Sequence, residues 1–181
     1  MPDLIKTRLL NDQEEVTQYI SLWADCVDYG LSIDDLIKDN GANVFAQELF
    51  RSGNQQLEGT ISLLLEARPN SRAIESARMA TEVFLKAYLA SKSGLTETEA
   101  RRRIGHDLKK ALDDCLIVEP QSELQAIRHG LNCFPEIGDR YKGTERTPRE
   151  LWQAYGVAQF TGTTVVRSLT GRDVRKTMRV G

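Results

Sequence analysis

Apolar residues recur every three or four positions along most of the chain, which is the spacing of amphipathic helices. The clearest stretch runs from Arg72 to Ser91, where apolar positions cover more than one face. Such a wide apolar surface predicts a central helix that is covered on several sides. Its polar line has four-residue steps, at Arg78, Glu82 and Lys86. The apolar positions are Ile74, Ala77, Ala80, Val83, Phe84, Leu85, Ala87, Tyr88 and Leu89.

The amino-terminal part of the chain predicts a helix from about Asp12 to Tyr29, which Gly30 would end. The segment Ser32–Lys38 predicts a separate short helical turn. The first helix carries one apolar stripe, formed by Val16, Tyr19, Ile20, Trp23 and Val27. The pattern leaves open whether this helix packs on the rest of the chain or reaches another subunit.

A second long helix is predicted from about Asn43 to Ala67, with Gly53 and Gly59 inside it. Each glycine costs about 1 kcal/mol relative to alanine in a helix interior. We therefore expect a bend, or a close contact with another helix, at these positions.

Further apolar stripes predict helices in the carboxy-terminal half of the chain. One begins at Leu108, a second spans Leu124–Phe134, and the last begins at Thr147 and ends at Gly171. Residues 135–146 have no periodicity and predict a loop. No strand pair stands out, so the fold class is predicted as all-α, an antiparallel bundle of four to five long helices. Residues 1–40 would be a helical extension, 41–172 the bundle and 173–181 a mobile basic tail.

Composition narrows the range of functions. The net charge is −2, which gives no electrostatic basis for general binding to nucleic acid. The sequence has no long apolar run and no signal-peptide pattern, so we expect no membrane segment and a cytoplasmic location with reduced cysteines. It also lacks phosphate-loop, dinucleotide-binding and zinc-protease motifs, and its two histidines are His106 and His129. We therefore expect neither a metal nor a cofactor.

Three short segments, taken in order, resemble the HEPN family (higher eukaryotes and prokaryotes nucleotide-binding). They are Glu82-Val83-Phe84-Leu85-Lys86-Ala87, then Gly105-His106-Asp107-Leu108, then Arg140-Tyr141. The resemblance covers roughly residues 43–171. It implies a helical bundle that is usually a homodimer and has a role near nucleotides or RNA. Many HEPN proteins are metal-independent ribonucleases in toxin–antitoxin or defence systems, whereas others are inactive binding modules or partners of nucleotidyltransferases.

The resemblance also indicates which residues would form a site. RNA cleavage through the 2′-hydroxyl needs an acid or base, which histidine supplies, and a positive charge on the phosphate. Arg101 and His106 have the family's arginine-to-histidine spacing and are the candidate catalytic residues, although they precede a different helix from the usual one. Candidate ligand-binding residues are Lys86, Arg102, Arg103, Arg140 and Tyr141.

Three functions stay open from the sequence. The first is a nucleotide- or RNA-binding domain in which these residues line one cleft. The second is a ribonuclease that uses His106 as the base and Arg101 on the phosphate. The third is a protein-interaction module in which the polar residues are structural: Glu82 and Lys86 would form a simple ion pair one helical turn apart, and His106 would cap a helix.

Overall fold

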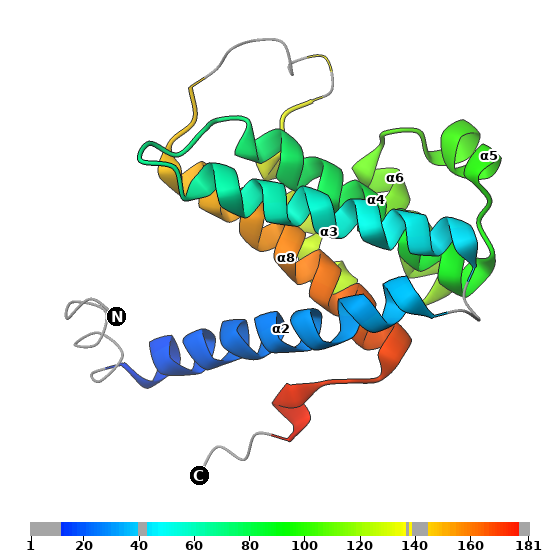
Figure 1. The fold of residues 1–181 in the computed structure, drawn as a ribbon, viewed down its shortest axis with the longest axis horizontal. Helices are drawn as coiled ribbons and strands as arrows, with labels where there is room; N and C mark the ends of the chain where they lie inside the picture. The colour runs from blue at the N-terminus through cyan, green and yellow to red at the C-terminus, as the bar shows by residue number, and fades with distance from the viewer. Residues whose placement is uncertain (1–11, 40–42, 137, 139–144, 178–181) are drawn as a thin grey trace.

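The computed structural model describes residues 12–39, 43–136, 138 and 145–177 (Figure 1). These residues form helices and no strand, so the predicted all-α bundle is confirmed. The α-helices are α2 (Gln13–Lys38), α3 (Val44–Leu64), α4 (Ala73–Ser93), α5 (Glu97–Glu99), α6 (Leu108–Val118), α7 (Ile127–Gly130) and α8 (Pro148–Thr170). Shorter helical turns are η1 (Ala100–Ile104), η2 (Glu123–Ala126), η3 (Leu131–Cys133) and η5 (Val174–Lys176).

Helix α4 is the centre of the bundle, as its wide apolar surface predicts. It packs against α3, α8 and α6, and it is buried almost continuously from Ala77 to Ala90. Gly94 ends the helix in the left-handed conformation, with φ of 69°. The region predicted as one helix from Leu124 to Phe134 is instead a succession of η2, α7 and η3.

Two glycines let α3 and α8 approach α4 closely on either side of Phe84. A Cβ atom on Gly53 of α3 would lie 2.6 Å from the Phe84 ring, and one on Gly162 of α8 would lie 3.0 Å from it. The Phe84 side chain is fully buried and forms an edge-to-face contact with Tyr29 of α2. The close contact expected at Gly53 is therefore confirmed.

Helix α2 differs from the prediction in its length. It continues through Gly30 to Lys38, so the predicted stop at Gly30 is wrong. Glycine within a helix costs only about 1 kcal/mol, and buried residues on both sides of Gly30, such as Tyr29 and Ile33, hold the helix against the bundle.

The buried face of α2 carries polar side chains beside the apolar Ala24, Tyr29 and Ile33. Asp25, Asp28 and Ser32 are buried, whereas Tyr19 and Trp23 of its apolar stripe are exposed. In Figure 1, α2 extends beyond the end of the bundle, so that its amino-terminal half lies clear of α3 and α8. Among the described residues, no helix combines the length and apolar character needed to cross a bilayer.

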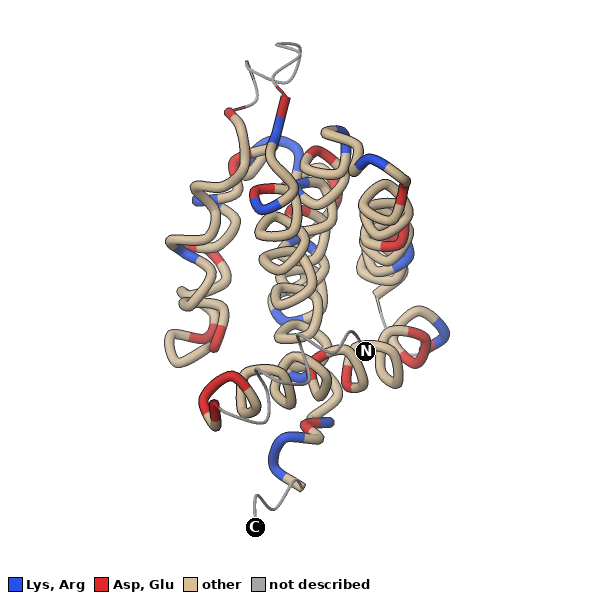
Figure 2. Tube along the Cα trace, turned by 90° about the vertical axis from the view of Figure 1, so that its left-hand side faces the viewer, with Lys and Arg blue, Asp and Glu red and all other residues tan. Residues whose placement is uncertain are grey.

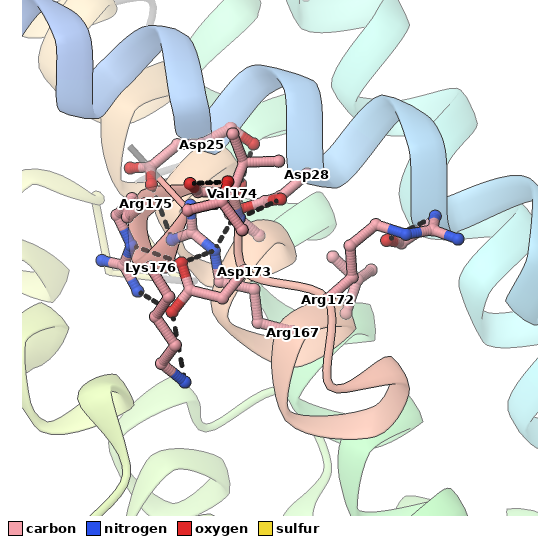
Figure 3. Close-up of polar contacts among 12 residues, drawn as sticks. Asp25, Asp28, Arg167, Arg172, Asp173, Val174, Arg175 and Lys176 are labelled. Carbon is pink, nitrogen blue, oxygen red and sulfur yellow. Dashed lines mark hydrogen bonds and ion pairs between the residues drawn. The ribbon is translucent and has the colours of Figure 1, made fainter. Parts of the chain in front are cut away.

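A buried ion cluster joins α2, α8 and the start of the carboxy-terminal tail (Figure 3). Arg167 of α8 lies 2.6 Å from carboxylate oxygens of both Asp25 and Asp28, and 3.8 Å from Asp173. Asp28 also accepts a hydrogen bond from the backbone N–H of Val174. The cluster therefore connects residues that are far apart in the sequence.

The first part of the predicted mobile basic tail is held in place. Residues Val174–Lys176 form the helical turn η5, which contacts α2. Arg175 lies 3.0 Å from carboxylate oxygens of both Asp173 and Glu123. Asp173 belongs to the tail itself, whereas Glu123 belongs to η2, and the local sequence does not reveal this second partner. Residues 178–181 lie outside the described residues.

The packing around Phe84 predicts opposite effects for two glycines of α8. Changing Gly162 to alanine should lower the free energy of unfolding by about 1–3 kcal/mol, because the added methyl would overlap the buried rings of Tyr29 and Phe84. The matched control is Gly156→Ala, where nothing lies within 4 Å and the better helix former should raise stability by up to about 1 kcal/mol. Urea unfolding of both variants measures this, and equal effects would contradict the close packing.

The ion cluster predicts a pH dependence of stability. Hydrogen bonds from Arg175 hold the pKa of Asp173 below its usual value. A lowered pKa means that the stabilisation is complete above the unfolded-state pKa of about 4 and is lost as the pH falls through the folded-state pKa. Asp173→Asn should therefore be less stable than the wild type at pH 7, with a difference that shrinks below about pH 4. Thermal unfolding at several pH values measures this; a constant difference would rule out the ionised carboxylate as its source.

Candidate functional site

Glu82 is a buried acidic residue in the centre of α4 that has basic residues on both sides. Its side chain is only 2% exposed, yet Oε1 lies 2.7 Å from Nζ of Lys86 and Oε2 lies 3.4 Å from Nη1 of Arg78. The three residues are spaced by four positions, which places them on one face of the helix. Burying a carboxylate without such partners would cost several kcal/mol. The Arg78–Glu82–Lys86 line therefore explains how charged residues are accommodated in the core.

The same three residues fix the loop that precedes α6. Arg78 donates a hydrogen bond of 2.7 Å to the carbonyl of His106, and Lys86 donates one of 2.6 Å to the carbonyl of Gly105. Gly105 has a φ of 59°, which a residue with a side chain rarely adopts. The loop is thus attached to α4 through its backbone.

The His106 side chain joins this cluster through one ring nitrogen. Nδ1 lies 3.0 and 3.2 Å from the two carboxylate oxygens of Glu82. A carboxylate can only accept, so Nδ1 carries the proton in this contact and Nε2 of a neutral ring is left as an acceptor. The side chain is 57% exposed. The carboxylate of Glu82 therefore orients the imidazole, and much of the ring is open to solvent.

A cleft of about 320 Å³ opens beside His106. Its lining combines charged side chains with the apolar side chains of Leu108, Leu131, Phe134 and Pro135. Asp107 also caps α6, because its carboxylate accepts a hydrogen bond from the N–H of Lys110. The lining residues are Arg78, His106, Asp107, Leu108, Lys109, Leu131, Phe134, Pro135 and Glu136.

The structure brings together only some of the predicted site residues. Lys86 and His106 both contact Glu82, but Lys86 does not belong to the cleft lining. Arg101 does not line the cleft; its side chain is 80% exposed and forms an ion pair of 2.8 Å with Glu97.

The other predicted ligand-binding residues lie elsewhere or outside the described part of the chain. Arg102 is exposed, and Arg103 lies 3.4 Å from Asp114, so neither belongs to the cleft lining. Arg140 and Tyr141 lie outside the described residues.

Two basic residues of the cleft, Arg78 and Lys109, were not among the predicted site residues. A signal for Arg78 exists in the sequence, because it lies one helical turn before Glu82, on the same face as Glu82 and Lys86. Lys109 has no comparable signal, since a lysine at the start of a helix is usually a solvated side chain. Within the described ranges, no three His, Cys, Asp or Glu side chains gather as a metal site would require.

The Arg78–Glu82–Lys86 line predicts that replacing Glu82 lowers stability far more than replacing an exposed glutamate. Glu82→Ala should lower the free energy of unfolding by about 3–5 kcal/mol, because it leaves two buried cations without their carboxylate. The matched control is Glu97→Ala, which removes an exposed ion pair with Arg101 and should change stability by less than about 1 kcal/mol. Chemical denaturation of the two variants measures both values. A small loss for Glu82→Ala would show that this carboxylate does not hold the cluster together.

Comparison with known proteins finds no relative of this chain. The chain matches no family model, no curated protein and no solved structure. The relation to the HEPN family therefore stays a prediction that rests on the segments around Glu82, His106 and Arg140.

Proposed function

We propose that the protein binds a nucleotide, with its phosphate beside His106. The observation that carries the proposal is the exposed imidazole of His106, which is oriented by a buried carboxylate at the mouth of a cleft. A merely structural histidine would more often be enclosed. Here the buried line in α4 positions the ring and leaves its second nitrogen free to meet a ligand.

The cations beside the cleft could bind an anionic group. Arg78 and Lys86 carry two positive charges, and Glu82 carries one negative charge. Lys109 adds a further cation to the cleft lining, whereas Asp107 and Glu136 add two carboxylates, so that the charges of these six residues balance. Arginine and lysine are the side chains that most often bind phosphate. A phosphate beside His106 would therefore depend on direct contacts with Arg78 or Lys109.

The shape and the wider charge pattern favour a single nucleotide over a long RNA. The cleft volume of about 320 Å³ is at the lower end of the range for small-ligand sites, about 300–1,000 Å³. Leu131, Phe134 and Pro135 provide an apolar wall against which a base or sugar could pack. Along the chain trace of Figure 2, Lys and Arg positions are interspersed with Asp and Glu positions. Long RNA usually requires a basic face.

A ribonuclease is the second candidate, and the contact between Glu82 and Nδ1 of His106 favours it. That contact leaves Nε2 available to remove a proton from a ribose hydroxyl. The phosphate charge would then be stabilised by Arg78, which lines the cleft, and not by Arg101, which pairs with Glu97. Cleavage of single-stranded RNA by the wild type, and its loss in His106→Ala, would support this function.

Two adjacent lysines of α6 provide a matched test of nucleotide binding. Lys109 lines the cleft and Lys110 does not. Lys109→Ala should weaken the binding of AMP or GMP about tenfold, the effect of losing one charge-assisted hydrogen bond of about 1.4 kcal/mol. Lys110→Ala should leave binding unchanged. Isothermal titration calorimetry measures the affinities.

Further outcomes of this titration are equally informative. His106→Ala should also weaken binding, whereas the fold should be kept because the ring is largely exposed. Absence of nucleotide binding by the wild type, or equal losses in Lys109→Ala and Lys110→Ala, would refute the proposal. Tight, salt-sensitive binding of a single-stranded oligoribonucleotide without binding of mononucleotides would instead identify RNA as the ligand.

A further inference from the structure

A second pocket, of about 450 Å³, lies where α2 packs against α3 and α8. This volume is within the range of small-ligand sites, about 300–1,000 Å³. The pocket shares no lining residue with the cleft at His106, so it is separate from the site of the proposed function. Its lining residues are Cys26, Tyr29, Gly30, Ile33, Asp34, Asn54, Leu57, Glu58, Ile61, Tyr155 and Gln159.

The missing side chain of Gly30 leaves part of this pocket open. A Cβ atom added to Gly30 would meet nothing within 4 Å. Gly53 and Gly162 differ from it, because their missing side chains make room for the ring of Phe84. A glycine in a helix interior is destabilising relative to alanine, and close packing within the protein does not account for it at Gly30. The space beside Gly30 is therefore available to a ligand.

The buried part of the pocket lining is apolar. Leu57 and Ile33 are almost fully buried, and Ile61 follows Leu57 by one turn of α3 and is half-buried. A hydrocarbon chain or a ring that contacts these side chains would be removed from water, which is favourable. The pocket therefore suits a ligand with an apolar body, and the polar residues of the lining decide which polar group that ligand carries.

The two tyrosine hydroxyls of the lining both donate their proton within the protein. Tyr29 donates a hydrogen bond of 2.8 Å to Oδ1 of Asn54. Tyr155 donates one of 3.2 Å to Oε1 of Gln159. Burial raises the pKa of Tyr29, and the charge of Glu58 adds to this effect, so its hydroxyl stays protonated at neutral pH. Because their protons are already used, both hydroxyls can only accept a hydrogen bond from a ligand.

Glu58 gives the pocket a negative charge. Its Oε1 accepts a hydrogen bond of 2.9 Å from Nδ2 of Asn54, and no described residue forms an ion pair with it. Asp34 is a second carboxylate of the lining, but it is already paired with Lys38. The lining contains no Lys, Arg or His. Its charge therefore favours a cation, and its acceptors favour a cation that donates several hydrogen bonds.

We propose that this pocket binds a small organic amine, with the ammonium group at Glu58 and the apolar body against Leu57 and Ile33. An ammonium group has three N–H donors and no acceptor, which matches a carboxylate and two accepting hydroxyls. The face of a tyrosine ring also attracts a cation. The ring of Tyr155 is itself in edge-to-face contact with Trp152, with 5.8 Å between the ring centroids.

Three compounds of nearly equal size test the preference for a cation. Phenethylamine is positively charged at neutral pH, phenethyl alcohol is neutral and phenylacetate is negatively charged. Isothermal titration calorimetry with the full chain should show binding of the amine, and binding of the alcohol that is weaker by about tenfold or more, because a charge-assisted hydrogen bond is lost. Phenylacetate should not bind. Absence of amine binding, or equal affinities for the amine and the alcohol, would overturn the proposal.

Two glutamates of α3 provide a matched pair of variants. Glu58→Gln keeps the shape of the side chain and removes its charge, so it should weaken phenethylamine binding by about tenfold. The control is Glu48→Gln, because Glu48 is exposed on the same helix and does not line the pocket. That variant should bind the amine as the wild type does. Equal affinities of the two variants would place the amine elsewhere and refute the assignment.

Filling the space beside Gly30 tests the position of the ligand independently of charge. Gly30→Leu should abolish amine binding, because the leucine side chain would occupy the open part of the pocket. The variant should be at least as stable as the wild type to urea, since leucine is the better helix former and its Cβ meets no neighbour. Undiminished amine binding by this folded variant would contradict the proposal.

The thiol of Cys26 offers a direct readout of occupancy. Cys26 is exposed and lines the pocket, whereas Cys133 is half-buried and lies outside it. Saturating phenethylamine should slow the alkylation of Cys26 by iodoacetamide several-fold and leave the rate at Cys133 unchanged, as peptide mass spectrometry measures. An unaltered rate at Cys26 would show that the amine does not enter this pocket, and the proposal would then be wrong.

Discussion

The buried guanidinium of Arg167 is the interaction on which the arrangement of the termini depends. It is neutralised by Asp25 and Asp28 from α2 and lies near Asp173 from the tail. A buried charge must meet partners of opposite sign, and only one rotation of α2 provides two of them. That rotation buries Asp25, Asp28 and Ser32 together with Tyr29 and Ile33, and it exposes Tyr19 and Trp23. Part of the apolar surface of this helix is therefore left in contact with solvent.

Glu82 acts in a similar way at the other charged position of the core. Arg78 and Lys86 neutralise it, and both also bind backbone carbonyls of the loop that carries His106. The charged residues of α4 therefore help to fix the position and orientation of the imidazole, which lines the cleft.

The sequence pattern predicts where the helices lie better than it predicts which face of each helix is buried. The wide apolar surface of α4 and the close contact at Gly53 follow from local patterns, because both express packing on a single element. The course of α2 through Gly30 does not, since contacts with α8 outweigh the small cost of one glycine. Nor could the pattern show that the apolar stripe of α2 faces outward, because that depends on Arg167, which lies far along the chain.

The candidate site was only partly predictable for the same reason. The order of the motifs along the chain was enough to associate Glu82, Lys86 and His106 with one another. Lys109, in contrast, lines the cleft because of the direction in which α6 begins. Arg101 has suitable spacing to His106 along the chain, but its side chain pairs with Glu97 in the preceding turn. Sequence spacing fixes distance along the chain and not the direction in which a side chain points.

The contact between Asp28 and Arg167 spans 139 residues, and this separation has a consequence for biosynthesis. A ribosome adds roughly 5–20 residues per second, so α2 would wait on the order of ten seconds for its partner to emerge. Throughout that time its aromatic residues and its unpaired aspartates are accessible to chaperones or to neighbouring nascent chains. Helix α2 can therefore complete its contacts with α8 only after Arg167 has been synthesised.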